Sequence, residues 1–288
     1  MPKISDIQKE YRGKIDQFDL ELLLCHALGK SRVFILAHPE YEIPSLKIRN
    51  LKLKIARRAK GEPVAYLIGH REFYGLDFKV NKHTLIPRPE TELMVEQVLD
   101  LLRSELRSNV VVDIGTGSGC IIISIAHGSK NDAGYFATDI SANALKVARK
   151  NAEAHNLDKK IKFLHGSLLE PLLKSKSYKL TAKSLVVTAN LPYLSKEIYE
   201  SAPRDVLDFE PKSALYSNKA GLAHYEKLLK QIHQLLVTDY ELRVTAFLEI
   251  SPEQKQPISR LIKSILPEAE TSFTKDLAGK WRICKIKI

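Results

Sequence analysis

From residue 109 onward, short apolar stretches alternate with amphipathic segments, and this alternation limits the possible folds more than any other feature of the sequence. Stretches that are apolar along their whole length are typical of a parallel sheet with helices on both faces. Two late stretches, 271–273 and 281–288, are expected to add an antiparallel pair. We therefore expect an α/β fold with a parallel sheet covered by helices on both faces, whose first five strands cover residues 110–114, 135–139, 161–164, 185–189 and 244–250.

The first part of the chain has a different pattern. Apolar residues recur at three- and four-residue spacing over residues 15–27 and again after Pro44, and Gly29 and Gly61 mark where these two helices would end. Aromatic and β-branched residues around Gly75 predict a β-hairpin. We expect three parts: a helical domain over residues 1–70, a hairpin linker over 71–90 and the α/β domain over 91–288.

Composition excludes several classes of protein. No apolar stretch approaches the roughly 20 residues that span a bilayer, and the N-terminus lacks the apolar core of a signal peptide, so we expect a cytoplasmic protein. The 3 cysteines and 9 scattered histidines lack metal-ligand spacing, so no metal is expected. The net charge of +11 favours a partner such as RNA, or a protein that works beside RNA, although a solvated basic surface explains it equally well.

A glycine-rich loop over residues 115–120 directly follows the first strand and opens a helix. Glycines let the backbone turn tightly and approach a ligand, and a helix N-terminus suits a carboxylate. Asp139 ends the next strand, about 20 residues further on, where it can accept hydrogen bonds from two ribose hydroxyls. The alternative is a structural turn with a capping aspartate. We expect an adenosine-containing cofactor, held by Asp113, Gly115, Thr116, Gly117, Ser118, Gly119 and Asp139.

The tetrapeptide Asn190-Leu191-Pro192-Tyr193 follows the fourth strand, at the carboxyl edge where open α/β sheets bind ligands. A planar nitrogen is a poor nucleophile unless both of its N–H bonds meet acceptors, which leaves the lone pair free to attack. The Asn190 side chain and the Leu191 carbonyl can accept these bonds. Tyr193 offers a flat face to a planar target, and Pro192 stiffens the turn. The pattern predicts catalysis on a planar nitrogen without a strong general base. Alternatively, Asn and Pro are ordinary turn formers.

These motifs together resemble the HemK/PrmC family, which methylates the side-chain amide nitrogen of the glutamine in the Gly-Gly-Gln tip of peptide-chain release factors. The resemblance covers nearly the whole chain. It implies a class I (Rossmann-like) methyltransferase fold, S-adenosylmethionine as the methyl donor and S-adenosylhomocysteine as the product. Further segments that carry it are residues 61–69, 72–76, 85–92, 209–211, 214–215, 221–222 and 275–279.

The resemblance also implies roles for individual parts of the chain. The helical domain would help to dock the release factor, and the enzyme is expected to act as a monomer that needs no direct contact with nucleic acid. The tetrapeptide would be catalytic and would bind the substrate, and Asn190 and Leu168 would also contact the cofactor. Arg88, Pro89 and Glu90 would line the target pocket; the alternative for them is a well-capped helix start.

The chain departs from the family pattern at three positions. Leu191 stands where proline is usual in the tetrapeptide, although its backbone carbonyl can still accept a hydrogen bond. Ser167 stands where an acidic residue often contacts the base region of the cofactor, and Ser251 replaces a usual glycine.

Three other functions compete with this interpretation. Asn-Leu-Pro-Tyr is also similar to the motif of ribosomal RNA adenine dimethyltransferases, but that family lacks the helical domain and the segment 87–92. A second alternative is a sister enzyme that methylates a glutamine of a ribosomal large-subunit protein, and the sequence distinguishes this enzyme less well from the release-factor enzyme. A non-catalytic RNA- or ribosome-binding module is a third possibility, against which the intact Asp113, Asp139 and Asn190 argue.

Overall fold

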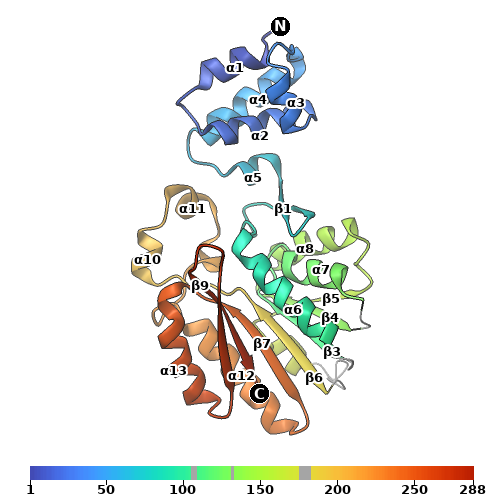
Figure 1. Ribbon diagram of the computed structural model, residues 1–288, viewed down its shortest axis with the longest axis vertical. Coiled ribbons are helices and arrows are strands. Elements are labelled where there is room, and N and C mark those ends of the chain that lie inside the picture. Colours follow the sequence, from blue (N-terminus) through green and yellow to red (C-terminus); the bar gives the residue numbers. More distant parts are fainter. Residues whose placement is uncertain (105–108, 131–132, 175–182) are drawn as a thin grey trace. The chain divides into compact units, whose positions relative to one another are not determined.

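The computed structural model describes residues 1–104, 109–130, 133–174 and 183–288, and these divide into two compact units (Figure 1). One unit consists of residues 1–70 together with residues 203–209, and the other of residues 71–202 and 210–288. Residues 203–209 therefore cluster with the helical unit, although they lie far along the chain within the segment expected to belong to the α/β domain.

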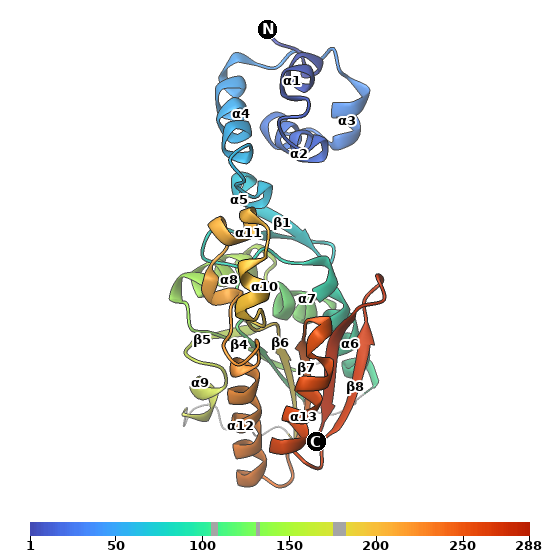
Figure 2. The same cartoon turned by 90° about the vertical axis from the view of Figure 1, so that its left-hand side faces the viewer.

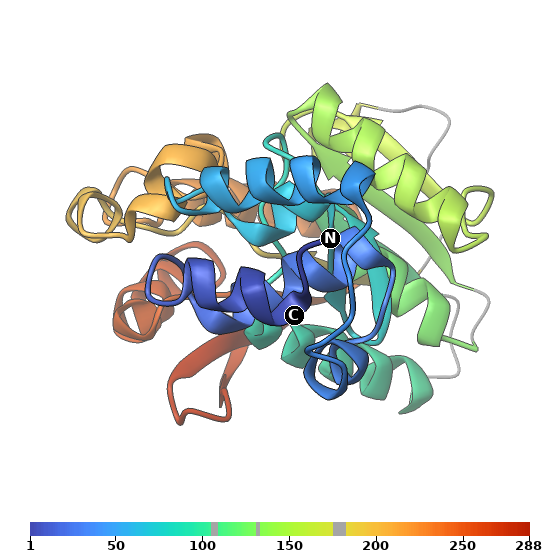
Figure 3. The ribbon, with the colours of Figure 1, turned by 90° about the horizontal axis from the view of Figure 1, so that it is seen from above.

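The first unit is helical. It contains α1 (Ile4–Tyr11), α2 (Gln17–Leu28), α3 (Arg32–Ala37), α4 (Ser45–Arg58), α5 (Val64–Ile68) and α11 (Arg204–Phe209). Helix α2 packs against α3, α4 and α5. Figures 2 and 3 show the blue helices of this unit gathered together. It ends at Gly29, as predicted. The spacing predicts a buried face of Ile15, Phe18, Leu22, Leu23 and Ala27. Of these Leu23 is buried, Phe18 is exposed, and Leu20 and Leu24 are buried instead. Four consecutive positions of this helix, residues 22–25, are apolar, so the periodicity marks the buried face poorly.

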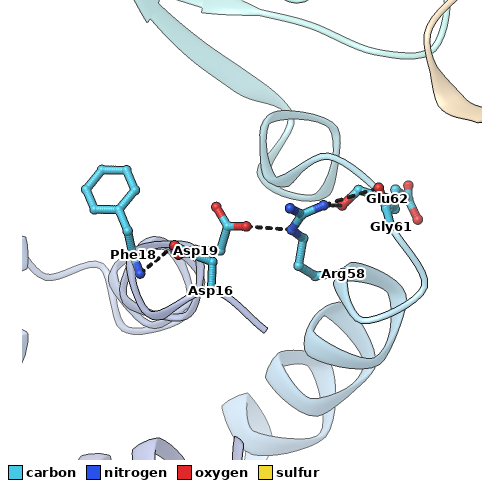
Figure 4. Close-up of polar contacts among 6 residues, drawn as sticks. All are labelled: Asp16, Phe18, Asp19, Arg58, Gly61 and Glu62. Carbon is cyan, nitrogen blue, oxygen red and sulfur yellow. Dashed lines mark hydrogen bonds and ion pairs between the residues drawn. The ribbon is translucent and has the colours of Figure 1, made fainter. Parts of the chain in front are cut away.

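Polar contacts hold α2 and α4 together (Figure 4). Asp16 caps α2 by accepting a hydrogen bond from the Phe18 amide at 2.8 Å. The Arg58 guanidinium donates to Asp19 at 2.6 Å and to the Gly61 carbonyl at 3.2 Å. One arginine thus joins α2, α4 and the turn that follows α4.

The second unit contains a hairpin and a seven-stranded sheet. The hairpin consists of β1 (His70–Phe73) and β2 (Leu76–Lys79). The sheet has the order β5-β4-β3-β6-β7-β9-β8, in which β3 to β7 run parallel and β9 runs antiparallel to both β7 and β8. The expected parallel sheet and late antiparallel pair are confirmed. The strands are β3 (Asn109–Ile114), β4 (Gly134–Asp139), β5 (Ile161–His165), β6 (Ser184–Ala189), β7 (Arg243–Glu249), β8 (Glu270–Lys275) and β9 (Trp281–Lys287).

Helices cover both faces of this sheet (Figures 1 and 2). Successive strand residues point to opposite faces, so Val111 packs with α6 and α7 while Val112 packs with α12 and α13. In the described part of the chain, no helix is long and apolar enough to cross a membrane. The helices of this unit are α6 (Glu92–Ser104), α7 (Cys120–Gly128), α8 (Ala142–Ala154), α9 (Glu170–Leu173), α10 (Lys196–Glu200), α12 (Ala223–Thr238) and α13 (Lys255–Ile265), with 3₁₀ turns η1 (Pro89–Thr91), η2 (Lys212–Ala214) and η3 (Pro252–Gln254).

The strand order reverses between β3 and β6. From β3 the chain continues to β4 and β5 on one side, and it then returns to place β6 on the other side of β3. Ile114 at the end of β3 is in register with Ala189 at the end of β6. The glycine loop and the tetrapeptide therefore leave neighbouring strands at the same level, in the crevice where open α/β sheets bind ligands.

Candidate active site

A cavity of about 280 Å³ lies at this reversal point. The glycine loop, the end of β4, the segment 166–168 and the tetrapeptide contribute to its wall. Of the residues expected from the sequence, those that line it are Arg88, Gly115, Thr116, Gly117, Ser118, Asp139, Leu168, Asn190, Leu191 and Pro192. The expected residues that lie outside its wall are Pro89, Glu90, Asp113, Gly119 and Tyr193.

The glycine loop is a tight turn between β3 and α7. Gly115, Gly117 and Gly119 all have φ between 57° and 83°, in the left-handed region. A Cβ at Gly119 would lie 2.9 Å from the Ile123 side chain, so this glycine lets α7 begin rather than facing the cavity. The loop thus brings backbone groups and the N-terminus of a nine-residue helix to the cavity.

Asp113 lies beneath the glycine loop. It is fully buried and accepts hydrogen bonds from the Thr116 hydroxyl at 2.6 Å and the Thr188 hydroxyl at 2.8 Å. Burial raises the pKa of this carboxyl from 3.8 to about 7. The side chain therefore points into the protein and holds Thr116 in place, while the expected contact of Asp113 with the cofactor stays a prediction.

Asp139 lies in the cavity wall at the end of β4. One of its carboxylate oxygens accepts from the Gly117 amide at 2.9 Å, and the other accepts from the Ser141 amide at 2.7 Å. Burial raises the pKa of this carboxyl as well. Each carboxylate oxygen can accept two hydrogen bonds, so both keep a free lone pair. Asp139 therefore anchors the glycine loop and can still accept the two hydroxyls of a ribose.

The segment 166–168 forms another part of the wall. Leu168 has φ of 52°, a conformation that costs a branched residue about 1–2 kcal/mol. Ser167 accepts a hydrogen bond from Lys227 at 2.9 Å, and the same lysine pairs with Glu170 at 2.9 Å. Ser167 thus stands at the position where the family often has an acidic residue, and its hydroxyl already accepts a hydrogen bond from Lys227.

Leu191 stands where the tetrapeptide usually has a proline, and side-chain packing holds it in place where a proline ring would restrict the backbone. Its side chain is buried, and its Cδ2 lies 3.1 Å from where a Cβ of Gly115 would stand. The leucine therefore locks the tetrapeptide against the glycine loop of the neighbouring strand.

Tyr193 is half-buried and lies outside the cavity wall, and its expected stacking role stays a prediction. Its hydroxyl donates to Glu249 at 3.3 Å, and its backbone carbonyl accepts from Gln254 at 2.9 Å. Burial, and then the carboxylate of Glu249, raise the pKa of the phenol above its usual range. Tyr193 thus anchors the end of the tetrapeptide in the protein interior.

Among the described residues, the Asn190 carboxamide has a hydrogen-bond partner on its nitrogen side alone. Its Nδ2 donates to the Thr91 hydroxyl at 3.2 Å, and that hydroxyl donates to Glu249 at 2.6 Å. The side-chain carbonyl of Asn190 is then the end available to a ligand in the cavity. Sequence reasoning missed Glu249, and the only signal was an acid at the end of an otherwise apolar strand.

Arg88 is the member of the Pro-Arg-Pro-Glu segment that reaches the cavity. It forms an ion pair with the buried Glu210, whose other oxygen accepts from the Ile86 amide at 3.1 Å. Pro89 and Glu90 are exposed and start the turn η1, so the helix-start alternative describes them better. The resemblance included Glu210 without indicating this role.

The other residues of the cavity wall include three basic or imidazole side chains that no sequence signal indicated. Lys82 and His83 lie in exposed positions at its wall, while His224 is partly buried and contacts the Ser217 hydroxyl at 2.9 Å. Burial lowers the pKa of His224. They come from a turn and from α12, and no spacing rule relates them to the glycine loop.

Comparison with known proteins places these features in a family. A model of the PrmC N-terminal domain matches residues 9–69, and a model of a methyltransferase domain matches residues 106–269. The catalytic domain of hMettl16 in complex with MAT2A 3'UTR hairpin 1 has a similar fold, with a TM-score of 0.56, 19% identity and coverage of 81% of this chain and 79% of that one.

Curated relatives are more closely similar in sequence. The chain is 40% identical over 216 residues to the release factor glutamine methyltransferase of Nitratidesulfovibrio vulgaris, covering 75% of this chain and 70% of that protein. It is 33% identical over 274 residues to the enzyme of the same name from Enterococcus faecalis, covering 95% and 93%. The resemblance noted from the motifs is confirmed, and the chain belongs to the family of release factor glutamine methyltransferases.

Proposed function

We propose that this enzyme transfers a methyl group from S-adenosylmethionine to the side-chain amide nitrogen of the glutamine in the Gly-Gly-Gln motif of peptide-chain release factors. The observation that carries the proposal is the one-sided hold on Asn190, whose amide nitrogen is bonded to Thr91 while its carbonyl remains for the target. The names of the relatives support the choice of substrate.

The residues of the cavity fit S-adenosylmethionine. The positive φ angles of the glycine loop bring its backbone to the cavity at the N-terminus of α7, which suits the carboxylate of the methionine part. Asp139 keeps a lone pair on each oxygen for the ribose hydroxyls. We assign the base region to the segment 166–168, in which Leu168 supplies apolar surface. When bound, the cofactor supplies a methyl group on a positively charged sulfur and leaves as S-adenosylhomocysteine.

The chain's own groups act on the target amide by positioning it. The Asn190 side-chain carbonyl and the Leu191 backbone carbonyl accept the two N–H bonds, which fixes the amide plane and directs the nitrogen lone pair along the line of attack. Pro192 shapes the wall beside them, and Tyr193 anchors the loop from the interior. Arg88, held by Glu210, offers N–H donors to backbone carbonyls of the bound peptide.

Other parts of the proposal remain predictions. The division into a docking domain over residues 1–70, a linker over 71–90 and a catalytic domain over 91–288 is one of them, and the monomeric state is another. Because translation termination takes place in the cytoplasm, the proposed substrate also assigns the enzyme to that compartment.

The test is mass spectrometry of an unmethylated bacterial release factor after incubation with the enzyme and S-adenosylmethionine. We expect a gain of one methyl group on the glutamine of the Gly-Gly-Gln peptide. Transfer to a ribosomal protein or to naked ribosomal RNA, with none to the release factor, would contradict the proposal. Asn190→Ala should abolish transfer while the cofactor still binds in calorimetry, and near-normal turnover would remove the assigned role of Asn190.

A further inference from the structure

We propose that Glu249 and Thr91 are positioning residues that decide which end of the Asn190 carboxamide faces the cavity. This inference rests on the proposed function, because it concerns the orientation of the group that receives the target amide. Thr91 lies in the cavity wall and Glu249 lies behind it. In this scheme both act through Asn190.

The three side chains form a short hydrogen-bonded chain from the protein interior to the cavity. Glu249 at the end of β7 is 1% exposed and Thr91 in η1 is 2% exposed, so water does not compete for their hydrogen bonds. Glu249 Oε2 lies 2.6 Å from Thr91 Oγ1, which in turn lies 3.2 Å from Asn190 Nδ2. The chain joins residues that are 158 positions apart in the sequence.

The direction of these bonds follows from the number of hydrogens. An ionised carboxylate can only accept, so the single hydrogen of the Thr91 hydroxyl must point to Glu249. The oxygen of that hydroxyl then faces Asn190 as an acceptor, and only the NH₂ end of the carboxamide can bond to it. The Asn190 carbonyl is thereby turned to the cavity, where it can accept a target N–H.

Reversing the first bond would reverse the last one. If residue 249 donates to Thr91, the hydroxyl hydrogen is released and can bond to Asn190 Oδ1. The carboxamide then turns its NH₂ group to the cavity, where two donors would oppose each other. A target amide would lose one of the acceptors that hold its plane.

The surroundings of Glu249 include groups that favour its ionised form. Burial raises the pKa of this carboxyl, whereas the Thr91 hydroxyl, the Arg282 guanidinium and the Tyr193 hydroxyl oppose that rise and the Glu90 carboxylate adds to it. Arg282 is itself paired with Asp276 at 3.0 Å. The Tyr225 hydroxyl bonds to the backbone carbonyl of Glu249 and leaves both carboxylate oxygens to Thr91 and Tyr193.

The experiment compares Thr91→Val, which keeps the shape and removes the hydroxyl, with Thr91→Ser, which keeps the hydroxyl, and with Glu249→Gln, which supplies a donor. Thr138→Val is the matched control, because it also removes a buried threonine hydroxyl, one that has no hydrogen-bond partner among the described residues. The measurements are kcat and KM for release-factor methylation, the Kd for S-adenosylmethionine and the melting temperature.

We expect Thr91→Val and Glu249→Gln to lower kcat by about 10- to 100-fold, with the cofactor Kd within about threefold of wild type, because misplacement of a positioning group costs about that much. Thr91→Ser and Thr138→Val should stay within about threefold of the wild-type kcat. If the wild type is active and both Thr91→Val and Glu249→Gln have the wild-type kcat, the inference is overturned. Parallel loss of kcat and cofactor binding in Thr91→Ser would overturn it too, because this pattern indicates a merely structural role.

A second measurement needs no substrate and so separates this inference from the proposed function. The Asn190 side-chain amide is followed in ¹H–¹⁵N NMR spectra and identified by its absence in Asn190→Ala. We expect its protons to exchange slowly with solvent in wild type and in Thr91→Ser, and faster in Thr91→Val. Equal exchange rates in wild type and Thr91→Val would refute the hydrogen-bonded chain. If the exchange rates differ as expected but the release factor is not methylated, only the proposed substrate would be refuted.

Discussion

Gly221 offers a test of how closely the chain packs behind the tetrapeptide. A Cβ at this position would lie 2.8 Å from the Tyr193 carbonyl carbon, and closer still to the carbonyl oxygen and to Gln254 Nε2. Its φ of 84° also lies in the left-handed region. Gly221→Ala must therefore displace the end of the tetrapeptide or break the hydrogen bond between Gln254 and Tyr193, which measures 2.9 Å.

The expected cost has two main parts. The left-handed conformation costs about 1–2 kcal/mol for a residue with a Cβ. Loss of the hydrogen bond from Gln254 adds about 0.5–1.5 kcal/mol, with the steric displacement on top. We expect Gly221→Ala to lower the free energy of unfolding by roughly 2–4 kcal/mol and to reduce methyl transfer by at least about tenfold, because the displaced segment carries the catalytic asparagine.

Gly279→Ala is the matched control for this substitution. Gly279 has φ of 75°, but nothing lies within 4 Å of where its Cβ would be, so alanine there bears only the backbone cost. Urea denaturation and initial rates of methyl transfer, measured on both variants, separate the steric effect from the backbone effect. Equal destabilisation by the two substitutions, with activity retained in Gly221→Ala, would refute the reasoning.

Three further predictions follow from the site. Asp139→Ala should raise the Kd for S-adenosylmethionine about 10- to 100-fold in calorimetry, because it removes acceptors for the ribose and the anchor of Gly117; an unchanged Kd would contradict this. The raised pKa of Asp113, about 7 against 3.8, means that its stabilising contribution is full below pH 4 and is lost as the pH rises to about 7. Asp113→Asn should remove that part of the pH dependence, on the order of 2–4 kcal/mol between pH 4 and pH 8 in urea titrations, and parallel profiles would argue against it. Arg88→Ala should cost roughly 1–3 kcal/mol by leaving buried Glu210 unpaired, and Arg88→Ala with Glu210→Gln should recover part of this; a double variant as unstable as the single one would count against the pairing.

Local patterns in the sequence were sufficient to predict the sheet, and also the glycine loop and the tetrapeptide that contribute to the cavity wall. Apolar stretches predicted β3 to β7 and the late antiparallel pair, because strands buried on both faces leave a signal within a few residues. The same patterns missed the short helices α9 and α10, the helix α13 and the placement of residues 203–209 with the helical unit. Short helices have too few turns to show a periodicity, and their positions depend on what they pack against.

The sequence alone also determined that Asn190 and Asp139 meet at one edge of the sheet, because both follow parallel strands that end at the same level. Only the tertiary structure decided which side chains face the cavity and which face the interior. Asp113 is buried beneath the glycine loop, Tyr193 is half-buried and bonds to Glu249, and Glu249 joins the site from a strand 59 positions beyond Asn190. The physical reason is that spacing along the chain specifies which face of a strand a residue occupies, whereas hydrogen bonds between distant elements form only once all of them have packed.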